Sequence, residues 1–168
     1  MSETKTRFVG KTIIHKANTR GHFDYGWLKT YHTFSFSNYY DPERVNFGML
    51  RVLNDDTIEA GEGFGTHPHN DMEIVTIPLE GAVAHKDSTG GEGVIYPDEI
   101  QVMSAGTGIH HSEYNHLNDG TTKLLRLWIF PDKKDTNQDT IRNFLIRKKE
   151  KINCNSLSLL KRRVITCG

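Results

Sequence analysis

The sequence predicts an all-β fold, an antiparallel sandwich or barrel in one domain. Short segments with alternating or continuous apolar residues follow one another closely, turn-forming residues separate them, and no convincing helical pattern precedes Asp139. Many short strands at this spacing are typical of antiparallel sandwiches and barrels. The 168 residues suit one domain with a sizeable core and leave room for a tail.

The individual strands are predicted from the period of the side chains. Tyr31–Phe36 alternates with a period of two, and Phe47–Leu53 predicts a buried strand that ends at the polar run Asn54-Asp55-Asp56. A polar loop is expected from Asn18 to Gly26. The other predicted strands are Thr12–His15, Phe64–His67, Met72–Leu79, Ala82–Lys86, Gly93–Tyr96, Ile100–Ser104, Ser112–His116 and Lys123–Phe130. Gly, Pro, Asn and Asp residues between them supply the turns.

The balance of charge changes near Thr136. The whole chain carries 21 basic and 21 acidic residues, so its charge indicates neither a nucleic-acid nor a membrane partner. From Ile141 to Gly168, however, eight residues are basic and one is acidic. We therefore divide the chain into a barrel, residues 1–135, and a basic tail, residues 136–168. Arg142–Ile152 is the candidate for a short amphipathic helix; the alternatives are nonspecific nucleic-acid binding and an adventitiously packed segment, which we favour.

The sequence predicts a cytoplasmic protein. No apolar run is long enough to span a bilayer, and the first residues lack the apolar core of a secretory signal. The two cysteines, Cys154 and Cys167, form no metal-binding motif, so we expect free thiols.

Two histidines flank a single proline within Gly61–Glu73. Residues i and i+2 of a strand point to the same face, so His67 and His69 would direct both imidazoles at one point. Proline cannot donate to a sheet ladder, so Pro68 predicts an edge, a strand start or a bulge. This spacing indicates a metal site.

A second strand-like segment adds two further candidate ligands. His110 and His111 are adjacent and must face opposite sides of a strand. His111 is the better candidate because Glu113 then shares its face. Three imidazoles and one carboxylate suit a first-row divalent metal that keeps positions open for substrate or oxygen.

Other titratable residues near these motifs are less certain as ligands. Glu73 lies four residues after His69 and is a candidate ligand, a hydrogen-bond acceptor that holds a ligand ring, or a simple strand residue. The histidines expected to make ordinary hydrogen bonds are His15, His22, His32, His85 and His116.

These motifs resemble those of the bacterial pirin-like proteins of the cupin superfamily. Gly61-x5-His67-x-His69-x3-Glu73 is similar to the first cupin motif, and the segment from Gly106 through His111 to Asn115 is similar to the second. The similarity covers roughly residues 10–133. The other segments that carry it are Arg20-Gly21-His22, Gly26-Trp27-Leu28, His32–Phe36, Asn38–Pro42, Arg51-Val52, Asp71-Met72-Glu73 and Met103–Glu113.

The resemblance implies a cupin jelly-roll barrel and a metal-dependent oxygenase. It implies that His67, His69, His111 and Glu113 bind one metal ion, with Glu73 in the outer shell. It also implies Fe(II), although Mn, Co, Ni, Cu or Zn would suit the same ligands. The implied activity is that of quercetin 2,3-dioxygenase, an enzyme that uses dioxygen to cleave a flavonol with release of carbon monoxide.

Within that activity, Glu113 is the candidate catalytic base for the flavonol hydroxyl. Aromatic side chains at the mouth would stack on the flat substrate, and Phe34, Phe36 and Phe64 are the candidates. The alternatives are a non-enzymatic, metal- or redox-responsive protein that binds a regulatory protein partner, and an inactive truncated form.

The resemblance ends near Thr136. Pirins have two barrels, and the family usually continues here with a run similar to Pro-Arg-Tyr-Asp-Gln. A set of codons for Asn137–Ile141 encodes Lys-Pro-Arg-Tyr-Asp when the reading frame is shifted by one base. We therefore interpret residues 136–168 as an out-of-frame remnant that replaces the second cupin. Apolar surface would then be exposed, and a dimer would be one way to cover it.

Overall fold

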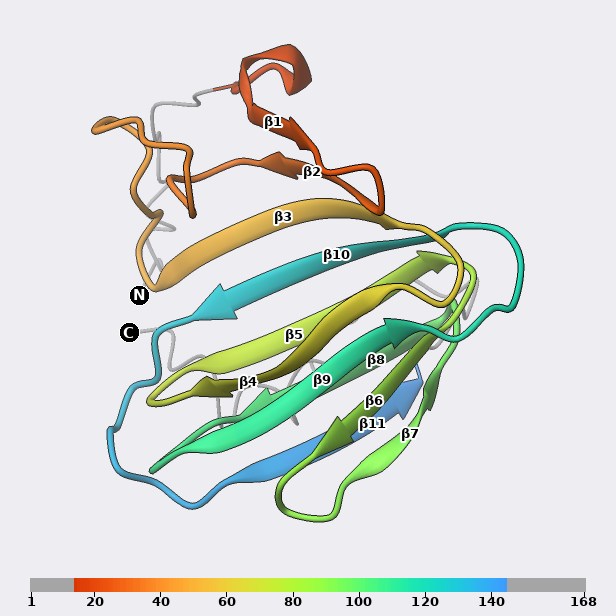
Figure 1. Cartoon of the computed structure of the whole chain (residues 1–168). Coiled ribbons are helices and arrows are strands. Elements are labelled where there is room, and N and C mark those ends of the chain that lie inside the picture. The colour runs from red at the N-terminus through yellow and green to blue at the C-terminus, as the bar shows by residue number, and fades with distance from the viewer. Residues whose placement is uncertain (1–13, 145–168) are drawn as a thin grey trace, which may run out of the picture.

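The regular secondary structure of the described residues consists almost entirely of strands, as the sequence predicts (Figure 1). The computed structural model describes residues 14–144. One short 3-10 helix, η1 (Ala17–Thr19), is the only helix in this range, and it is far too short to cross a membrane. The strands form two sheets, and each strand pairs antiparallel with its neighbours.

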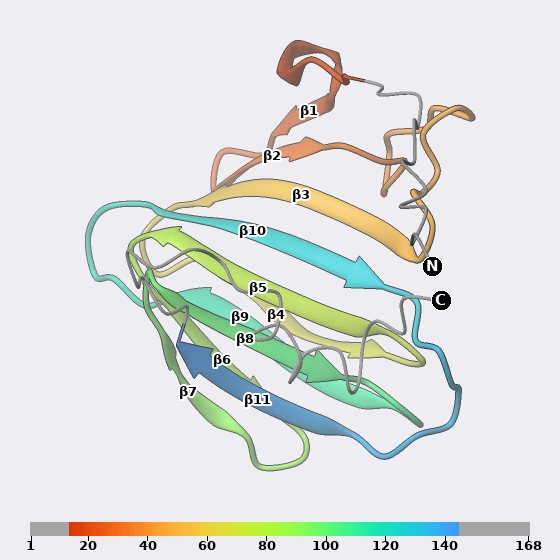
Figure 2. The same ribbon diagram turned by 180° about the vertical axis from the view of Figure 1, so that it is seen from behind.

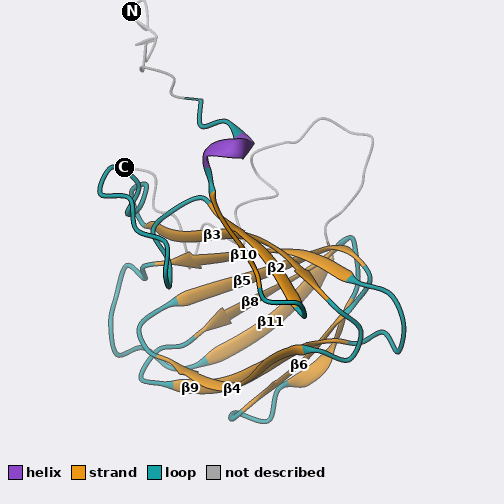
Figure 3. Ribbon diagram, turned by 45° about the horizontal axis from the view of Figure 1, so that its top comes forward, coloured by secondary structure: helices purple, strands orange, loops and turns teal. Residues whose placement is uncertain are grey.

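The two sheets differ in size and face each other as two layers (Figure 3). The seven-stranded sheet has the order β1 (Gly21–Asp24), β2 (Leu28–His32), β3 (Leu50–Ile58), β10 (Thr122–Ile129), β5 (Glu73–Glu80), β8 (Glu99–Ser104) and β11 (Asp139–Phe144). The four-stranded sheet has the order β4 (Gly63–His69), β9 (Ile109–Asn115), β6 (Val83–Asp87) and β7 (Glu92–Ile95).

Apolar side chains from both sheets form the core. One cluster joins Leu28, Ile58 and Leu124 of the large sheet to Val83 and Ile95 of the small sheet. A second cluster, formed by Ile74, Met103, Ala105 and Ile109, also draws on both sheets. Burial of each large aliphatic side chain stabilises the fold by about 1.5–3 kcal/mol, so these two clusters hold the layers together.

The polar run at the end of the third predicted strand is not a turn. Strand β3 continues through Asn54-Asp55-Asp56 to Ile58. Asn54 and Asp56 face the interior, where Asp56 forms an ion pair with Arg126 at 2.9 Å, and Asp55 faces the other side. The partner on β10 allows the acidic side chain to be buried, and it overrides the local preference of Asp for turns.

The N-terminal part of the sequence prediction needs three corrections. The predicted loop contains β1, which pairs with β2 along its whole length. Strand β2 ends at His32, so the alternating residues 33–36 lie outside it. Of the strand predicted at Thr12–His15, residues 14 and 15 have no regular structure, and the others lie outside the described residues.

The first part of the predicted basic tail extends the large sheet. Strand β11 pairs with the outer edge of β8 (Figure 2), where it satisfies backbone groups that would otherwise be unpaired. The helix predicted from residue 142 is therefore not formed at residues 142–144. The remainder of that segment and both cysteines lie outside the described residues. The out-of-frame interpretation of residues 136–168 and the dimer stay predictions.

Asn115 at the end of β9 ties the two sheets together. Its amide nitrogen donates to the carbonyl oxygens of Ile58 and Gly120, at 3.1 and 2.9 Å. Its amide oxygen accepts from the Leu117 backbone and the Thr122 hydroxyl, at 2.9 and 2.6 Å. One buried side chain therefore satisfies groups on β3, on β10 and in the loop between the sheets.

We expect Asn115→Ala to lower the free energy of unfolding by about 2–4 kcal/mol, because four hydrogen bonds are lost and buried partners remain. Urea denaturation measures this change. Asn118→Ala, at an exposed position of the same connection, is the control and should change stability by about 0.5 kcal/mol or less. Equal effects of the two substitutions would contradict the role of Asn115.

Candidate metal centre

The edge strand β4 presents two histidines to the interior. His67 and His69 lie on the same face, and their ring centroids are 4.8 Å apart. Pro68 between them is exposed on the outer face of this edge strand, where its missing N–H costs no ladder hydrogen bond. The predicted geometry of the two-histidine motif is therefore present.

A one-residue bulge determines which histidine of β9 faces this pair. Phe64 lies opposite Glu113, but after the irregularity at Gly65 and Thr66 the register shifts, and His67 lies opposite His111. Without the extra residue, His67 would lie opposite His110. The bulge thus lets Phe64 and His67 both face inward. His111 is buried and His110 is exposed, as the sequence predicts.

Three imidazoles meet between the sheets. One ring nitrogen each of His67, His69 and His111 lies within 4.8 Å of the others, a separation that allows all three to contact one cation. The ring of His111 has its centroid 4.5 Å from that of His67 and 4.9 Å from that of His69. The histidine side chains of two separate strands, β4 and β9, therefore converge at one point.

Several nitrogens at this point have no protein partner. Nε2 of His69 and both ring nitrogens of His111 are buried without a hydrogen bond to the described residues. Nδ1 of His67 lies 2.7 Å from the Gly65 carbonyl oxygen, which can only accept, so this nitrogen carries the proton and Nε2 keeps its lone pair. Unpaired buried nitrogens are costly, and a bound cation would satisfy them.

The imidazoles of His69 and His111 are neutral at physiological pH. Burial, together with the neighbouring His111 and His67 rings, lowers the pKa of His69 to about 3. Burial and the nearby His67 and His85 rings likewise lower the pKa of His111 to about 3. Metal binding at pH 7 would therefore displace no proton from these two candidate ligands.

Glu113 lies next to the three histidines but belongs to a second, overlapping group. It is 1 % exposed, and its Oε1 accepts a hydrogen bond of 2.5 Å from the Thr76 hydroxyl of the opposite sheet. Glu113, His85 and His111 each offer a ligand atom within 4.8 Å of the others. His111 is common to both groups, so all four predicted ligands lie around one region.

His85 makes the ordinary hydrogen bonds that the sequence analysis assigned to it. Its Nε2 donates to the Asp87 carboxylate at 2.9 Å, and its Nδ1 is 3.0 Å from the Gln101 amide. Burial by itself would raise the pKa of Asp87, but hydrogen bonds from Thr89 and His85 outweigh it and leave this pKa well below its usual range. Both nitrogens of His85 are therefore in use, which favours Glu113 over His85 as a ligand.

Glu73 lies on the other sheet and is not among the candidate metal groups of the described residues. The Ser104 hydroxyl of β8 donates to its Oε2 at 2.6 Å. This hydrogen bond joins two neighbouring strands of the large sheet.

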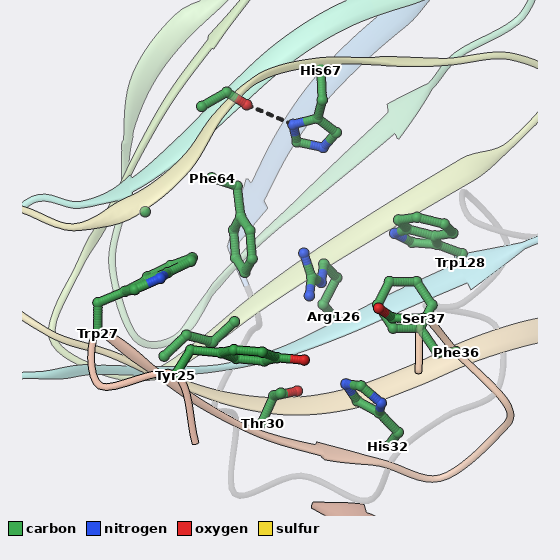
Figure 4. A pocket seen from close by; sticks show the side chains of 13 residues that line it. Tyr25, Trp27, Thr30, His32, Phe36, Ser37, Phe64, His67, Arg126 and Trp128 are labelled. Atoms are coloured by element: carbon green, nitrogen blue, oxygen red, sulfur yellow. Dashed lines mark hydrogen bonds between the residues drawn. The ribbon is translucent and has the colours of Figure 1, made fainter. Parts of the chain in front are cut away.

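A pocket of about 520 Å³ opens beside His67 (Figure 4). Aromatic side chains supply much of its wall, and they include two of the three predicted stacking residues, Phe36 and Phe64, but not Phe34. Trp128 connects the pocket with the histidines, because its ring lies 4.8 Å from that of His69. The other aromatic side chains of the wall are Tyr25, Trp27 and His32.

Sequence reasoning missed the arginine of this pocket. Arg126 is 5 % exposed, pairs with Asp56, and holds its guanidinium 4.1 Å from the centre of the Phe64 ring. A signal was present, because Arg126 interrupts a strongly apolar strand at a position whose neighbours, Leu124 and Trp128, face inward. Such a cation needs a buried anion elsewhere in the sequence.

The sequence profile of the Pirin family matches residues 13–129, more than half of the chain. The chain belongs to the pirin family. The match ends close to the last residue of β10, so this pirin domain contains both sheets except for β11.

Comparison with known proteins supports this assignment. The pirin domain is 57 % identical to quercetin 2,3-dioxygenase of Escherichia coli over 119 residues, which are 71 % of this chain and 52 % of that protein. The crystal structure of YhhW from E. coli is 51 % identical and superposes with a TM-score of 0.78 over 80 % of this chain and 57 % of YhhW. YhhW has also been solved as a complex with nickel(II), with a TM-score of 0.76 over 78 % of this chain and 57 % of YhhW. This chain spans about half the length of the curated relatives it matches.

A more distant structure supports the cupin fold. The cupin domain of Schizosaccharomyces pombe Cnp3 has a TM-score of 0.50 at 11 % identity, over 71 % of this chain and 75 % of that domain. The predicted cupin barrel is therefore confirmed.

The depressed histidine pKa values predict how the metal-free protein responds to acid. The unfolded chain takes up protons near pH 6.5, but His69 and His111 in the folded state do so only near pH 3. The stability that these two neutral histidines contribute is therefore fully present above about pH 6.5. Between about pH 6.5 and pH 3 it falls with the pH, by about 1.4 kcal/mol per pH unit for each histidine.

Urea denaturation of EDTA-treated protein between pH 7 and pH 4 measures this slope. A His69→Gln variant lacks one of the two groups and should show a shallower slope, while all carboxylates contribute as before. The same slope in both proteins would contradict the buried, neutral state of His69.

Proposed function

We propose that this pirin domain binds one divalent metal ion through His67, His69, His111 and Glu113 and oxygenates a flavonol as a quercetin 2,3-dioxygenase does. The observation that carries this proposal is the convergence of three interior imidazoles, with nitrogens that lack protein partners, beside an aromatic pocket. The name of the E. coli relative supplies the substrate class.

We propose Fe(II) as the native metal, with Mn, Co, Ni, Cu and Zn as compatible occupants, since neutral imidazoles suit all of these ions. The nickel(II) complex of YhhW supports the binding of a divalent ion by a pirin. When bound, the metal supplies Lewis acidity toward the flavonol hydroxyl and redox chemistry toward dioxygen.

The pocket would hold the flat substrate with its reacting end toward His67. Phe64 and Trp27 form an edge-to-face pair with ring centroids 5.5 Å apart, and Phe36 packs edge-on against Trp128 at 5.2 Å. These rings restrict one another and offer flat apolar walls, which suits a planar aromatic molecule and excludes water from its faces.

Glu113 would accept the proton of the flavonol 3-hydroxyl. Its carboxylate is buried, and Thr76 fixes one of its two oxygens, so the other oxygen remains for a ligand or for a proton. A carboxylate held in this way serves as a metal ligand and as a base only if its bond to the metal is weak enough to be exchanged during the reaction.

The double variant His67→Ala/His69→Ala tests the metal centre. After anaerobic loading with Fe(II), we expect about one metal ion per wild-type chain and close to none per variant chain, because two of three imidazole ligands are lost. Oxygen uptake with quercetin should fall to the level of free Fe(II). Uptake that persists in the variant would contradict the site, and metal binding without uptake by the wild type would favour the non-enzymatic alternative.

The substitution Glu113→Gln separates proton transfer from metal binding. We expect about 100-fold slower oxygen uptake, or slower still, because an amide cannot accept the proton, while the three histidines retain the metal. Oxygen electrode rates and metal analysis of the same sample measure both effects. The exposed Glu59→Gln substitution is the matched control and should leave the rate unchanged. An unchanged rate in Glu113→Gln would remove this residue from the chemistry.

A further inference from the structure

One wall of the pocket is polar although it is deeply buried. Thr30, His32 and Arg126 all line the pocket, and they are only 1 %, 2 % and 5 % exposed. Each carries an atom without a hydrogen-bond partner among the described residues: the Thr30 hydroxyl, Nδ1 of His32 and Nε of Arg126. The indole nitrogen of Trp128, at the border of the same wall, is also buried without a partner.

This wall stands across the pocket from the candidate metal ligand His67 (Figure 4). His67 belongs to the small sheet, whereas Thr30 and His32 on β2 and Arg126 on β10 belong to the large sheet. The sheet register aligns His32 with Asn54, which in turn lies opposite Arg126, so their side chains share the interior face. A ligand that spans the pocket would meet the metal centre at one end and this wall at the other.

The wall is polar without carrying a net charge. Asp56 lies opposite Thr30 in the sheet register, and its carboxylate pairs with the Arg126 guanidinium at 2.9 Å. This pair cancels the charge of the arginine, and it leaves the Nε–H available as a donor. A neutral oxygen of a ligand, such as a phenol or a ketone, would therefore suit the wall better than a second carboxylate.

The available groups have a definite hydrogen-bonding character. The Nε–H of Arg126 and the indole N–H of Trp128 can only donate, so they require acceptor oxygens. The Thr30 hydroxyl both donates and accepts, and it can also pair with a phenolic O–H. The aromatic walls beside these groups restrict the ligand to a flat ring that carries those oxygens.

We propose that Thr30, His32, Arg126 and Trp128 form an oxygen-binding subsite that selects flavonols by the ring hydroxyls remote from the metal-binding end. This proposal rests on the proposed function, from which it takes flavonols as the ligand class. In this arrangement the large sheet recognises the hydroxylated rings, and the metal ion bound by the small sheet contacts the 3-hydroxyl.

The chain contains its own reporter for this subsite. Its two tryptophans, Trp27 and Trp128, both line the pocket, so quenching of intrinsic fluorescence follows ligand binding there. The protein is loaded with nickel(II) under anaerobic conditions and titrated with quercetin and with 3-hydroxyflavone. Both compounds carry the 3-hydroxyl, so its contribution to binding cancels in the ratio of their dissociation constants. Only quercetin carries further hydroxyls, so the ratio reports the contribution of those hydroxyls.

We expect the wild-type protein to bind quercetin more tightly than 3-hydroxyflavone, by about five-fold for each hydrogen bond to the subsite. Thr30→Val keeps the shape of the side chain and removes its hydroxyl, and it should reduce this ratio about five-fold. Thr30→Ser restores a hydroxyl and should restore the ratio. Thr57→Val, on the opposite face of the same sheet, is the matched control and should leave the ratio at the wild-type value.

Thermal unfolding of each variant establishes that the fold is retained. Equal binding of the two flavonols by the wild type, or a ratio that Thr30→Val leaves unchanged, would overturn the subsite even if oxygen uptake supports the dioxygenase. A ratio that follows the Thr30 hydroxyl in a protein that consumes no oxygen would support the subsite and contradict the enzymatic proposal. Absence of quenching by either compound would overturn both.

Discussion

The candidate centre depends on a single irregularity, the bulge at Gly65 and Thr66 of β4. The strand must present Phe64 to the pocket and His67 to the centre, although a regular strand would turn residues three apart to opposite faces. The extra residue removes that conflict and moves the register from His110 to His111. The same bulge brings the Gly65 carbonyl to Nδ1 of His67, so it also determines which nitrogen of that ring faces the interior.

The two sheets contribute different parts of the site. The small sheet supplies the three imidazoles and Glu113, while the large sheet supplies Thr76, which orients Glu113. The large sheet and the loops between its first three strands together supply most of the pocket wall. Metal centre and pocket therefore depend on how the layers pack. The apolar clusters that join the sheets, together with the hydrogen bonds of Asn115, maintain that packing.

Buried polar groups without a partner are concentrated at the candidate metal centre and in the pocket beside it. The unpaired nitrogens of His69 and His111 lie beside His67, and His67 lines the same pocket as the unpaired atoms of Thr30 and Arg126. Each of these groups costs stability in the ligand-free protein, and occupation of the site would recover it. The buried Asp56–Arg126 pair contributes to this arrangement, because it places hydrogen-bond donors in an apolar cavity without adding a net charge.

The sequence by itself determined the all-β class, most strands and the convergence of the two-histidine motif, because the period of two and the i, i+2 spacing of His67 and His69 are local properties. It also indicated that His111 and not His110 faces inward. Only the tertiary structure decided what depends on partners far along the chain. The pairing of Asp56 with Arg126 continued a strand through polar residues at which it was expected to end, and the free edge of β8 made a strand of residues 139–144. The pairing of β2 and β10 with the two edges of β3 assembled the polar wall. A sequence pattern cannot specify such pairs, because the free energy that stabilises them arises only when the strands come together.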